Sequence, residues 1–173
     1  SIGFVRSLVI CTTPELSVVI PSWNTKDYLA ACLAHLAAAT KPTTEVIVVE
    51  NASQDGSYEY LCAEHPGITL IRNEKNEGFA RGSNQGMRVA TGAYVLLLNT
   101  DTEMHAEALA KMVAWLEAHS DFGAAAPRLV HRSGATQRTC MAFPTLATPL
   151  FFATPFERWF PNSRELVRYF MRE

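Results

Sequence analysis

The chain has 173 residues, of which 48% are hydrophobic and 18% are charged, and its mean hydropathy is +0.02. It is long enough to bury one core, and its composition is that of a globular protein rather than a disordered or fibrous one. The formal net charge of -2 gives no general attraction for nucleic acid, so we expect no nucleic-acid partner.

Apolar runs alternate with helical patterns through most of the chain. In chain order, the spacing predicts a strand over Leu16–Ile20, a helix over Asp27–Ala39, a strand over Glu45–Glu50, a helix over Ser57–Glu64, a strand over Ile68–Ile71, a helix over Phe79–Ala90, a strand over Tyr94–Leu98, a helix over Ala106–Ala118 and a strand over Phe122–Ala126. Pro21 is expected to end the first strand. This alternation indicates an α/β fold, with a mostly parallel sheet flanked by helices.

Two parts of the chain do not follow the alternation. Residues 1–14 contain a short apolar stretch with one arginine, and we interpret them as an N-terminal extension that is neither a signal peptide nor a membrane span. After about residue 127, prolines interrupt an irregular, aromatic-rich C-terminal segment. We therefore divide the chain into residues 1–14, a core over 15–126 and a C-terminal region over 127–173.

The most informative stretch is the apolar run Val95–Leu98, which is followed by Asn99 and Asp101. Side chains two residues apart on an extended chain point the same way, so both reach the carboxyl end of a strand. Open α/β sheets hold their ligands at this edge. A carboxylate there suits a Mg²⁺ or Mn²⁺ ion that carries substrate phosphates. The alternative is that Asp101 or Thr102 only caps the next helix.

Polar loops follow the other strands as well. Trp23 either stacks on a base or lines a pocket wall, and the alternative is that it packs beneath the next helix. Glu50 ends an apolar strand, where a carboxylate accepts from a base N–H or a ribose hydroxyl, or else serves as a satisfied turn acid. Asp55 is expected to be a structural cap.

The spacing of the glycines and cysteines excludes several classes of nucleotide-binding and zinc-binding protein. Gly78, Gly82 and Gly86 lie four residues apart, which favours close packing of a helix on the sheet or of backbone on a ligand. The glycine-rich signatures of dinucleotide-binding and P-loop proteins are absent after the first strand. The four cysteines have no zinc-ligand spacing, which fits a reducing, cytoplasmic compartment.

Together, four motifs resemble the family 2 glycosyltransferases, which have the Rossmann-like GT-A fold. They occur in the family's order: VVIPSWN at Val18–Asn24, VVENASQDGS at Val48–Ser57, NEGFARGSNQG at Asn76–Gly86 and YVLLLNTDT at Tyr94–Thr102. The resemblance runs from Leu16 to about Leu146. The N-x-D-T form is similar to the rhamnosyltransferase-like branch, which acts on cell-surface polysaccharides.

The resemblance implies a role for each matching position. The nucleotide-sugar-binding residues would be Pro21, Ser22, Trp23, Glu50, Asn51, Gly78, Asn84, Asn99 and Asp101. Glu50 stands where the family usually has an aspartate that holds the pyrimidine base, so the choice of base is left open. Asn99 would lie near the ribose. Asp101 takes the metal position and would contact the diphosphate through Mn²⁺ or Mg²⁺.

The implied reaction is an inverting transfer from a dTDP- or UDP-sugar to a saccharide or lipid-linked saccharide acceptor. It needs a general base. The family carries that base in a later motif that has no match here, so we expect it beyond Glu173. We interpret the chain as C-terminally truncated, with residues 127–173 as the incomplete start of the acceptor-side region. The implied place is the cytoplasm, at the inner face of the membrane, with peripheral membrane association. The alternative is a non-catalytic nucleotide-binding or assembly module that retains only the GT-A fold, which the aromatic C-terminal segment favours.

Overall fold

The computed structural model describes residues 13–39, 42–105, 107–131, 133–137, 141–152 and 154–171. The chain divides into two compact units, Ser1–Ala125 and Ala126–Glu173. The predicted extension over residues 1–14 lies almost entirely outside the described residues, and so does Ala106, the expected first residue of the fourth helix.

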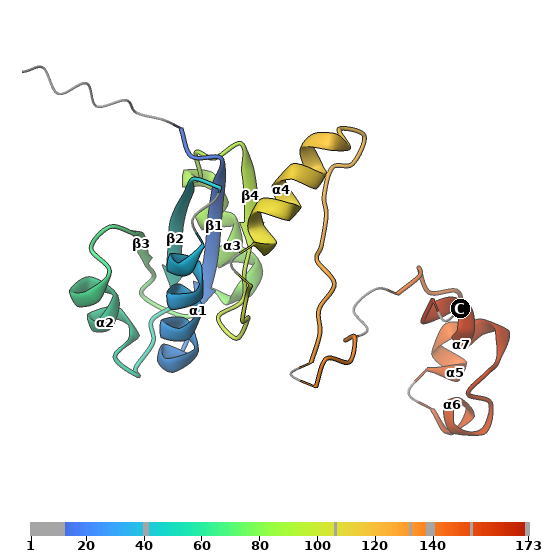
Figure 1. Ribbon diagram of the computed structural model, residues 1–173. Helices are drawn as coiled ribbons and strands as arrows, with labels where there is room; N and C mark the ends of the chain where they lie inside the picture. Colours follow the sequence, from blue (N-terminus) through green and yellow to red (C-terminus); the bar gives the residue numbers. More distant parts are fainter. Residues whose placement is uncertain are drawn as a thin grey trace, which may run out of the picture. The chain divides into compact units, whose positions relative to one another are not determined.

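The first unit is a parallel sheet with helices packed against it (Figure 1). Its strands are β1 (Leu16–Ser22), β2 (Thr44–Glu50), β3 (Thr69–Arg72) and β4 (Tyr94–Leu97), in the spatial order β3-β2-β1-β4. Each strand is followed by a helix: α1 (Lys26–Ala38), α2 (Ser57–Glu64), α3 (Gly78–Val89) and α4 (Ala108–Ala118). Neighbouring strands pair in parallel, which confirms the predicted mostly parallel, helix-flanked sheet.

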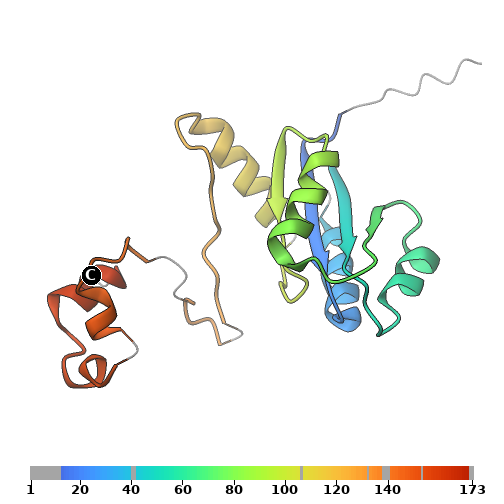
Figure 2. The same ribbon diagram turned by 180° about the vertical axis from the view of Figure 1, so that it is seen from behind.

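Helices α1 and α3 cover opposite faces of the sheet, as the two opposite views show (Figures 1 and 2). Val18 and Ile20 belong to the core cluster that includes Leu29 of α1, whereas Val19 lies against Gly86 of α3. All three β1 side chains are fully buried. Burial on both faces explains why the central residues of β1, Val18 to Ile20, are all apolar instead of alternating with polar ones.

Strand β1 continues through Pro21 to Ser22, so the prediction that Pro21 ends it is wrong. The Val19 carbonyl accepts a hydrogen bond from Leu98 N–H at 3.0 Å and therefore faces β4. Pro21 lies two residues further and faces the same side, beyond the last paired residue of β4, Leu97. The missing N–H of Pro21 costs no ladder hydrogen bond there, because β4 has already ended.

The predicted strand over Phe122–Ala126 is wrong. Phe122 N–H donates to the His119 carbonyl in the turn after α4, and its ring contacts Trp115 with centroids 5.1 Å apart. Residues 123–125 and Val113 line a hollow of about 320 Å³ beside β4, so these residues stand off from the strand instead of pairing with it. Within the described residues, no strand pairs with the outer edge of β4.

The second unit contains short helices joined by loops. They are α5 (Thr148–Phe151), α6 (Pro155–Trp159) and α7 (Arg164–Tyr169). Glu165 of α7 ties the unit together, because its carboxylate accepts from Thr145 Oγ1 at 2.6 Å and from Arg168 Nη2 at 2.8 Å. Among the described residues, no helix has the length and apolar character that crossing a membrane requires.

Candidate functional site

Three strands end side by side at the carboxyl edge of the sheet. Ser22 at the end of β1 lies in register with Glu50 at the end of β2, and Asn51 N–H donates to the Ser22 carbonyl at 2.9 Å. Strand β1 lies between β2 and β4, so the segment after β4 flanks the end of β1 from the other side. The loops that hold the predicted site residues of β1, β2 and β4 are therefore neighbours.

The segment after β4 presents Asn99 and Asp101 to solvent, and both side chains are exposed. Thr102 N–H donates to the Asn99 carbonyl at 3.3 Å and closes a turn between them. Helix α4 begins only at Ala108, with Glu107 at its N-cap position. Asp101 and Thr102 lie too far upstream to cap α4, so the helix-cap alternative is wrong.

The carboxylate of Asp101 lies near the thiol of Cys32 on α1. Burial, together with the negative charge of Asp101, raises the pKa of Cys32 to about 11. The thiol therefore stays protonated at neutral pH, and its Sγ donates to the Asn99 carbonyl at 3.9 Å. This contact joins α1 to the turn that carries Asp101.

At the carboxyl edge of the sheet, the protein would supply one side-chain ligand, the carboxylate of Asp101, to a divalent ion. Among the described residues, no group of three or more His, Cys, Asp and Glu side chains could hold a metal ion. Asp101 is an exposed carboxylate that makes no hydrogen bond or ion pair with another described side chain. Mg²⁺ is often bound by one or two carboxylates together with substrate phosphates and water. Asp101 fits that kind of site.

Trp23 follows β1 and is 52% exposed, so its ring is not packed beneath α1. The neighbouring Ser22 is buried, and its Oγ lies 3.2 Å from Thr25 Oγ1. Asn24 adopts a left-handed backbone with φ of 52°, and its Oδ1 accepts from Gln54 N–H at 2.8 Å. The turn thus leaves the indole at the surface beside the β2 loop.

Glu50 is fully buried at the end of β2. Its carboxylate accepts from the backbone N–H groups of Ala52, at 3.2 Å, and Ser53, at 2.5 Å. A buried acid needs such donors, because an unpaired charge away from water is costly. In the structure, the Glu50 carboxylate stabilises the loop that follows β2 through these two hydrogen bonds. Recognition of a base by Glu50 stays a prediction.

Asp55 holds the starts of two helices. Its Oδ2 accepts from Lys26 N–H, the first residue of α1, at 2.8 Å. Its Oδ1 accepts from the N–H of Ser57, the first residue of α2, at 3.1 Å. Partial burial raises the pKa of Asp55, but the hydrogen bonds from Ser57 and Lys26 outweigh it and hold the pKa below its ordinary value of 3.8.

We expect Asp55→Ala to lower the free energy of unfolding by about 1 to 2 kcal/mol at neutral pH, because two helix starts lose their acceptor. The lowered folded-state pKa means that this stabilisation is complete above the unfolded-state pKa and is lost as pH falls through the folded-state pKa. Urea unfolding of both proteins should show their difference shrinking in acid. Asp121→Ala, in an exposed turn, is the control. A difference that is constant with pH would contradict this assignment.

A partly buried amide network that joins the loop after β2, the loop after β3 and helix α3 was not expected from the sequence. Asn73, which follows β3, donates from Nδ2 to Asn51 Oδ1 and to Gln85 Oε1, each at 2.8 Å. Gln85 of α3 donates in return from Nε2 to Asn73 Oδ1 at 2.8 Å. Asn51 is 3% exposed, so this predicted site residue holds the framework together from below the surface.

The predicted residues of α3 occupy different positions. Gly78 begins the helix with a left-handed φ of 79°, which glycine adopts without strain. Gly82 and Gly86 lie against the sheet, where a Cβ on Gly86 would come within 2.3 Å of Val19 Cγ1. Asn84 is exposed. The predicted packing of helix on sheet is confirmed for Gly82 and Gly86, and the roles of Gly78 and Asn84 in closing over a nucleotide stay predictions.

Comparisons with known proteins match the chain to the family that its sequence motifs resemble. The sequence model described as "Glycosyl transferase family 2" matches residues 17–167. The "Uncharacterized glycosyltransferase YibD" of Escherichia coli (strain K12) is 33% identical over 97 residues, which is 54% of this chain and 28% of that protein. The chain thus spans about a third or less of the length of the first curated relatives it matches.

Solved structures resemble the same part of the chain. S. aureus TarS in complex with UDP is 25% identical with a TM-score of 0.56, and the match covers 61% of this chain and 33% of that one. The mannosyltransferase PcManGT from Pyrobaculum calidifontis, in complex with GDP-Man and Mn²⁺, is 28% identical with a TM-score of 0.56 and the same coverage. The GT-A fold expected from the sequence is therefore confirmed.

Proposed function

This chain belongs to glycosyl transferase family 2, and from that premise we propose that it forms the donor-binding part of an inverting glycosyltransferase. The donor would be a dTDP- or UDP-sugar, bound with Mn²⁺ or Mg²⁺. The observation that carries the proposal is the exposed pair Asn99 and Asp101 at the carboxyl end of β4, beside the end of β1. The complexes of TarS with UDP and of PcManGT with GDP-Man and Mn²⁺ support a nucleotide-bound, metal-dependent site.

Each loop would contribute a different contact. Asp101 would hold the ion, and Asn99 would lie near the ribose. The exposed ring of Trp23 offers a flat surface for the base, and Pro21 and Ser22, which precede it at the end of β1, would line the same pocket. The remaining proposed contacts come from the β2 loop and from α3, at Glu50, Asn51, Gly78 and Asn84.

The reaction makes one requirement at the donor diphosphate and another at the acceptor hydroxyl. A divalent ion, when bound, would neutralise the charge that develops on the leaving diphosphate. The residues of this chain would bind and orient that diphosphate and its nucleoside. The acceptor hydroxyl must lose its proton to a general base. Because Asp101 would be engaged with the ion, we assign it to donor binding and not to this step.

For the acceptor, we propose a saccharide or lipid-linked saccharide of a cell-surface polysaccharide, as in the rhamnosyltransferase-like branch. The place of the reaction would be the cytoplasm, at the inner face of the membrane. A lipid-linked acceptor would require the protein to meet that membrane at one of its surfaces.

Calorimetry with UDP, dTDP and GDP, each with and without Mn²⁺, tests the donor site. We expect UDP or dTDP to bind in the presence of Mn²⁺, and we expect this heat to disappear when the ion is removed. Binding that is equal with and without the ion would contradict the metal role of Asp101. The absence of binding by all three nucleotides at millimolar concentration would refute the donor site itself.

A further inference from the structure

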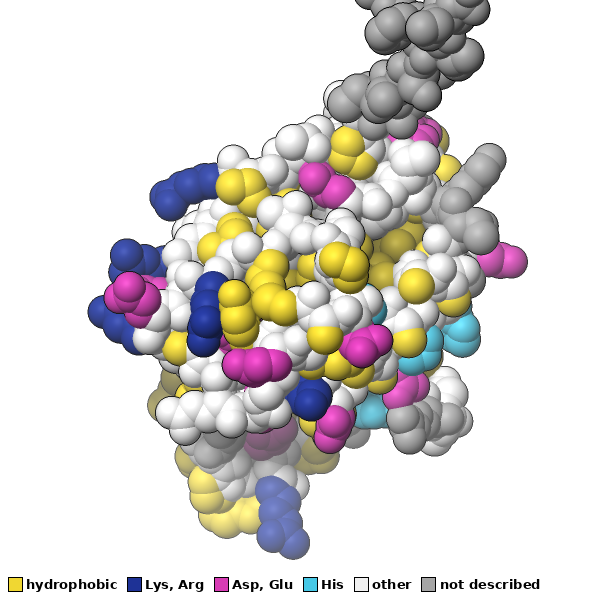
Figure 3. Space-filling view, turned by 90° about the vertical axis from the view of Figure 1, so that its left-hand side faces the viewer, with side chains coloured by type: hydrophobic (Ala, Val, Ile, Leu, Met, Phe, Trp, Pro, Cys, Tyr) yellow, Lys and Arg dark blue, Asp and Glu magenta, His cyan; other side chains and the backbone are white. Residues whose placement is uncertain are grey.

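Charge is divided unevenly between the two units. Residues 126–173 contain seven arginines, no lysine and three glutamates, which gives this unit a formal charge of +4. Because the whole chain carries -2, residues 1–125 carry -6. On the face shown in Figure 3, acidic and basic side chains lie scattered among hydrophobic ones. The second unit is thus the one with a net positive charge.

The second unit also exposes most of its large apolar side chains. Within its helices, Thr148 and Leu166 are buried, whereas the large apolar side chains around them are largely exposed. Trp159 is 67% exposed and Leu146 is 98% exposed. Exposed apolar surface of this kind usually marks a contact with a partner or a membrane.

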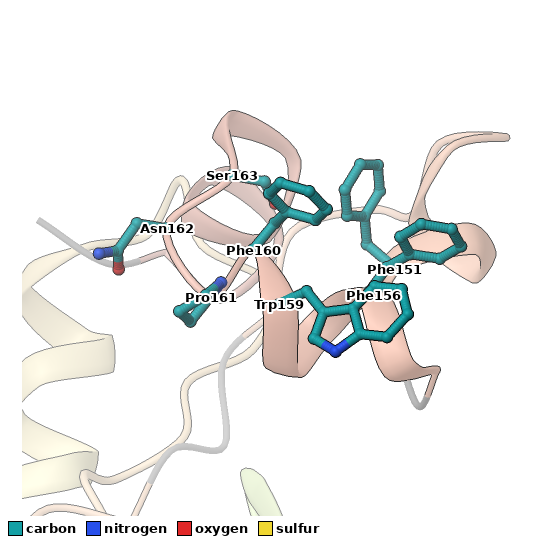
Figure 4. A pocket seen from close by; sticks show the side chains of 7 residues that line it. All are labelled: Phe151, Phe156, Trp159, Phe160, Pro161, Asn162 and Ser163. Atoms are coloured by element: carbon teal, nitrogen blue, oxygen red, sulfur yellow. The ribbon is translucent and has the colours of Figure 1, made fainter.

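Four aromatic rings gather around one hollow of about 580 Å³, lined in part by Phe151, Phe156, Trp159 and Phe160 (Figure 4). The rings hold one another in place, because the centroid of Phe156 lies 5.8 Å from that of Trp159 and 6.4 Å from that of Phe160. Aromatic contacts at such distances fix the geometry of the surface before anything binds to it.

Two arginines are sequence neighbours of residues that line this hollow. Arg158 directly precedes Trp159 in α6, and Arg164 begins α7 directly after Ser163, which lines the hollow. Both are exposed, and neither makes a salt bridge with another described residue. Arg168, in contrast, is paired with Glu165 at 2.8 Å. Helices α6 and α7 therefore carry two exposed arginines that form no salt bridge with a described residue, next in sequence to Trp159 and Ser163.

We propose that this surface, formed by Leu150, Phe156, Arg158, Trp159, Phe160 and Arg164, docks on a bilayer that contains anionic phospholipids. Tryptophan and phenylalanine are suited to the boundary between headgroups and acyl chains, and arginines are attracted to anionic headgroups. The first unit has a formal net charge of -6 and is repelled by an anionic bilayer, so contact with the bilayer is confined to the second unit. This inference rests on the proposed function in one respect. The proposed function requires the protein to meet a membrane, and the inference names the surface that does so.

The aliphatic side chains favour lipid over single-stranded nucleic acid as the occupant. Both ligands accept arginines and flat rings, since bases stack on aromatic side chains. Leu150 is 64% exposed and Met171 is 61% exposed, and neither offers a stacking surface. An acyl layer accommodates aromatic and aliphatic side chains alike.

Sedimentation with vesicles tests the proposal. We expect the protein to sediment with vesicles of phosphatidylcholine mixed with phosphatidylglycerol, and far less with vesicles of phosphatidylcholine alone. Replacing both arginines (Arg158→Gln with Arg164→Gln) should weaken binding to the anionic vesicles by about 10- to 30-fold. Trp159→Ser should also weaken binding, since it removes the ring most suited to the interface.

A matched charge control removes two cations from the first unit: Arg88→Gln with Lys111→Gln. Both residues are exposed, so this variant loses the same net charge but keeps the proposed surface. Equal weakening by the two double variants would overturn the assignment to the second unit. Equal binding to neutral and anionic vesicles, sedimentation with neither, or tighter binding to single-stranded RNA than to anionic vesicles would overturn the proposal. Because none of these measurements involves a nucleotide, failure here leaves the donor site untouched.

Discussion

Replacing Gly92 with alanine is expected to lower the free energy of unfolding by about 3 kcal/mol. Gly92 lies between α3 and β4, directly against the start of β1. A Cβ at this position would lie 2.6 Å from Ser17 N and 2.8 Å from Leu16 C. These are backbone atoms of a strand that is paired on both sides, so they cannot move away as a flexible side chain would.

The same displacement would break a set of hydrogen bonds. Gly92 N–H donates to Ser17 Oγ at 2.8 Å and to Glu45 Oε1 at 3.2 Å. Thr91 N–H donates to the same Glu45 oxygen at 2.6 Å. Any movement of Gly92 away from β1 would pull these donors from a carboxylate that joins β1, β2 and the approach to β4. We therefore expect the loss to be at the upper end of the range for overpacked sites.

Gly67→Ala is the matched control. No heavy atom lies within 4 Å of a Cβ built on Gly67, and its backbone is not left-handed. Alanine there should change stability by less than about 1 kcal/mol, and in the stabilising direction if anything, because it reduces the freedom of the unfolded chain. Urea unfolding followed by circular dichroism measures both variants. Equal stability of Gly92→Ala and Gly67→Ala would show that β1 tolerates the added methyl group.

The pattern of apolar residues was enough to predict the four paired strands of the first unit. Val18, Val19 and Ile20 are all buried because helices cover both faces, and such a run has one plausible place, in a buried strand. The glycine spacing on α3 likewise reported close contact with the sheet. Sequence patterns succeed here because each is visible as a run or a regular spacing of residues within one element.

The failures involve features that local sequence patterns do not mark. Asn73 joins Asn51 and Gln85, which are 22 and 12 residues away, and no local pattern marks an asparagine for that role. The sequence pattern predicts Phe122 in a strand, but the Phe122 ring packs against the ring of Trp115 in α4. A short apolar run cannot reveal whether a partner strand is within reach. The net charge of -2 likewise concealed the opposite signs of the two units.

Asp101→Asn is expected to weaken binding of UDP or dTDP with Mn²⁺ by at least about 100-fold. Residues that only support a metal ligand typically cost 10- to 100-fold in metal affinity when they are changed, so loss of a proposed ligand should cost no less. Asparagine keeps the size of the side chain and one oxygen, and it removes the charge. The exposed carboxylate makes no hydrogen bond with another described residue, so stability should change by less than about 0.5 kcal/mol.

Asp121→Asn provides the matched control, since Asp121 is also an exposed acid in a turn of the first unit. Calorimetry of the wild type and both variants, with and without Mn²⁺, separates the effects. Loss of affinity in Asp101→Asn alone, and only in the presence of the ion, would place the ion at Asp101. Equal losses in both variants would indicate a general effect of charge on nucleotide binding. Unchanged affinity in Asp101→Asn would mean that a different group holds the diphosphate. Asn99 and Trp23 would then be the residues to change, because both are proposed site residues with exposed side chains at this edge.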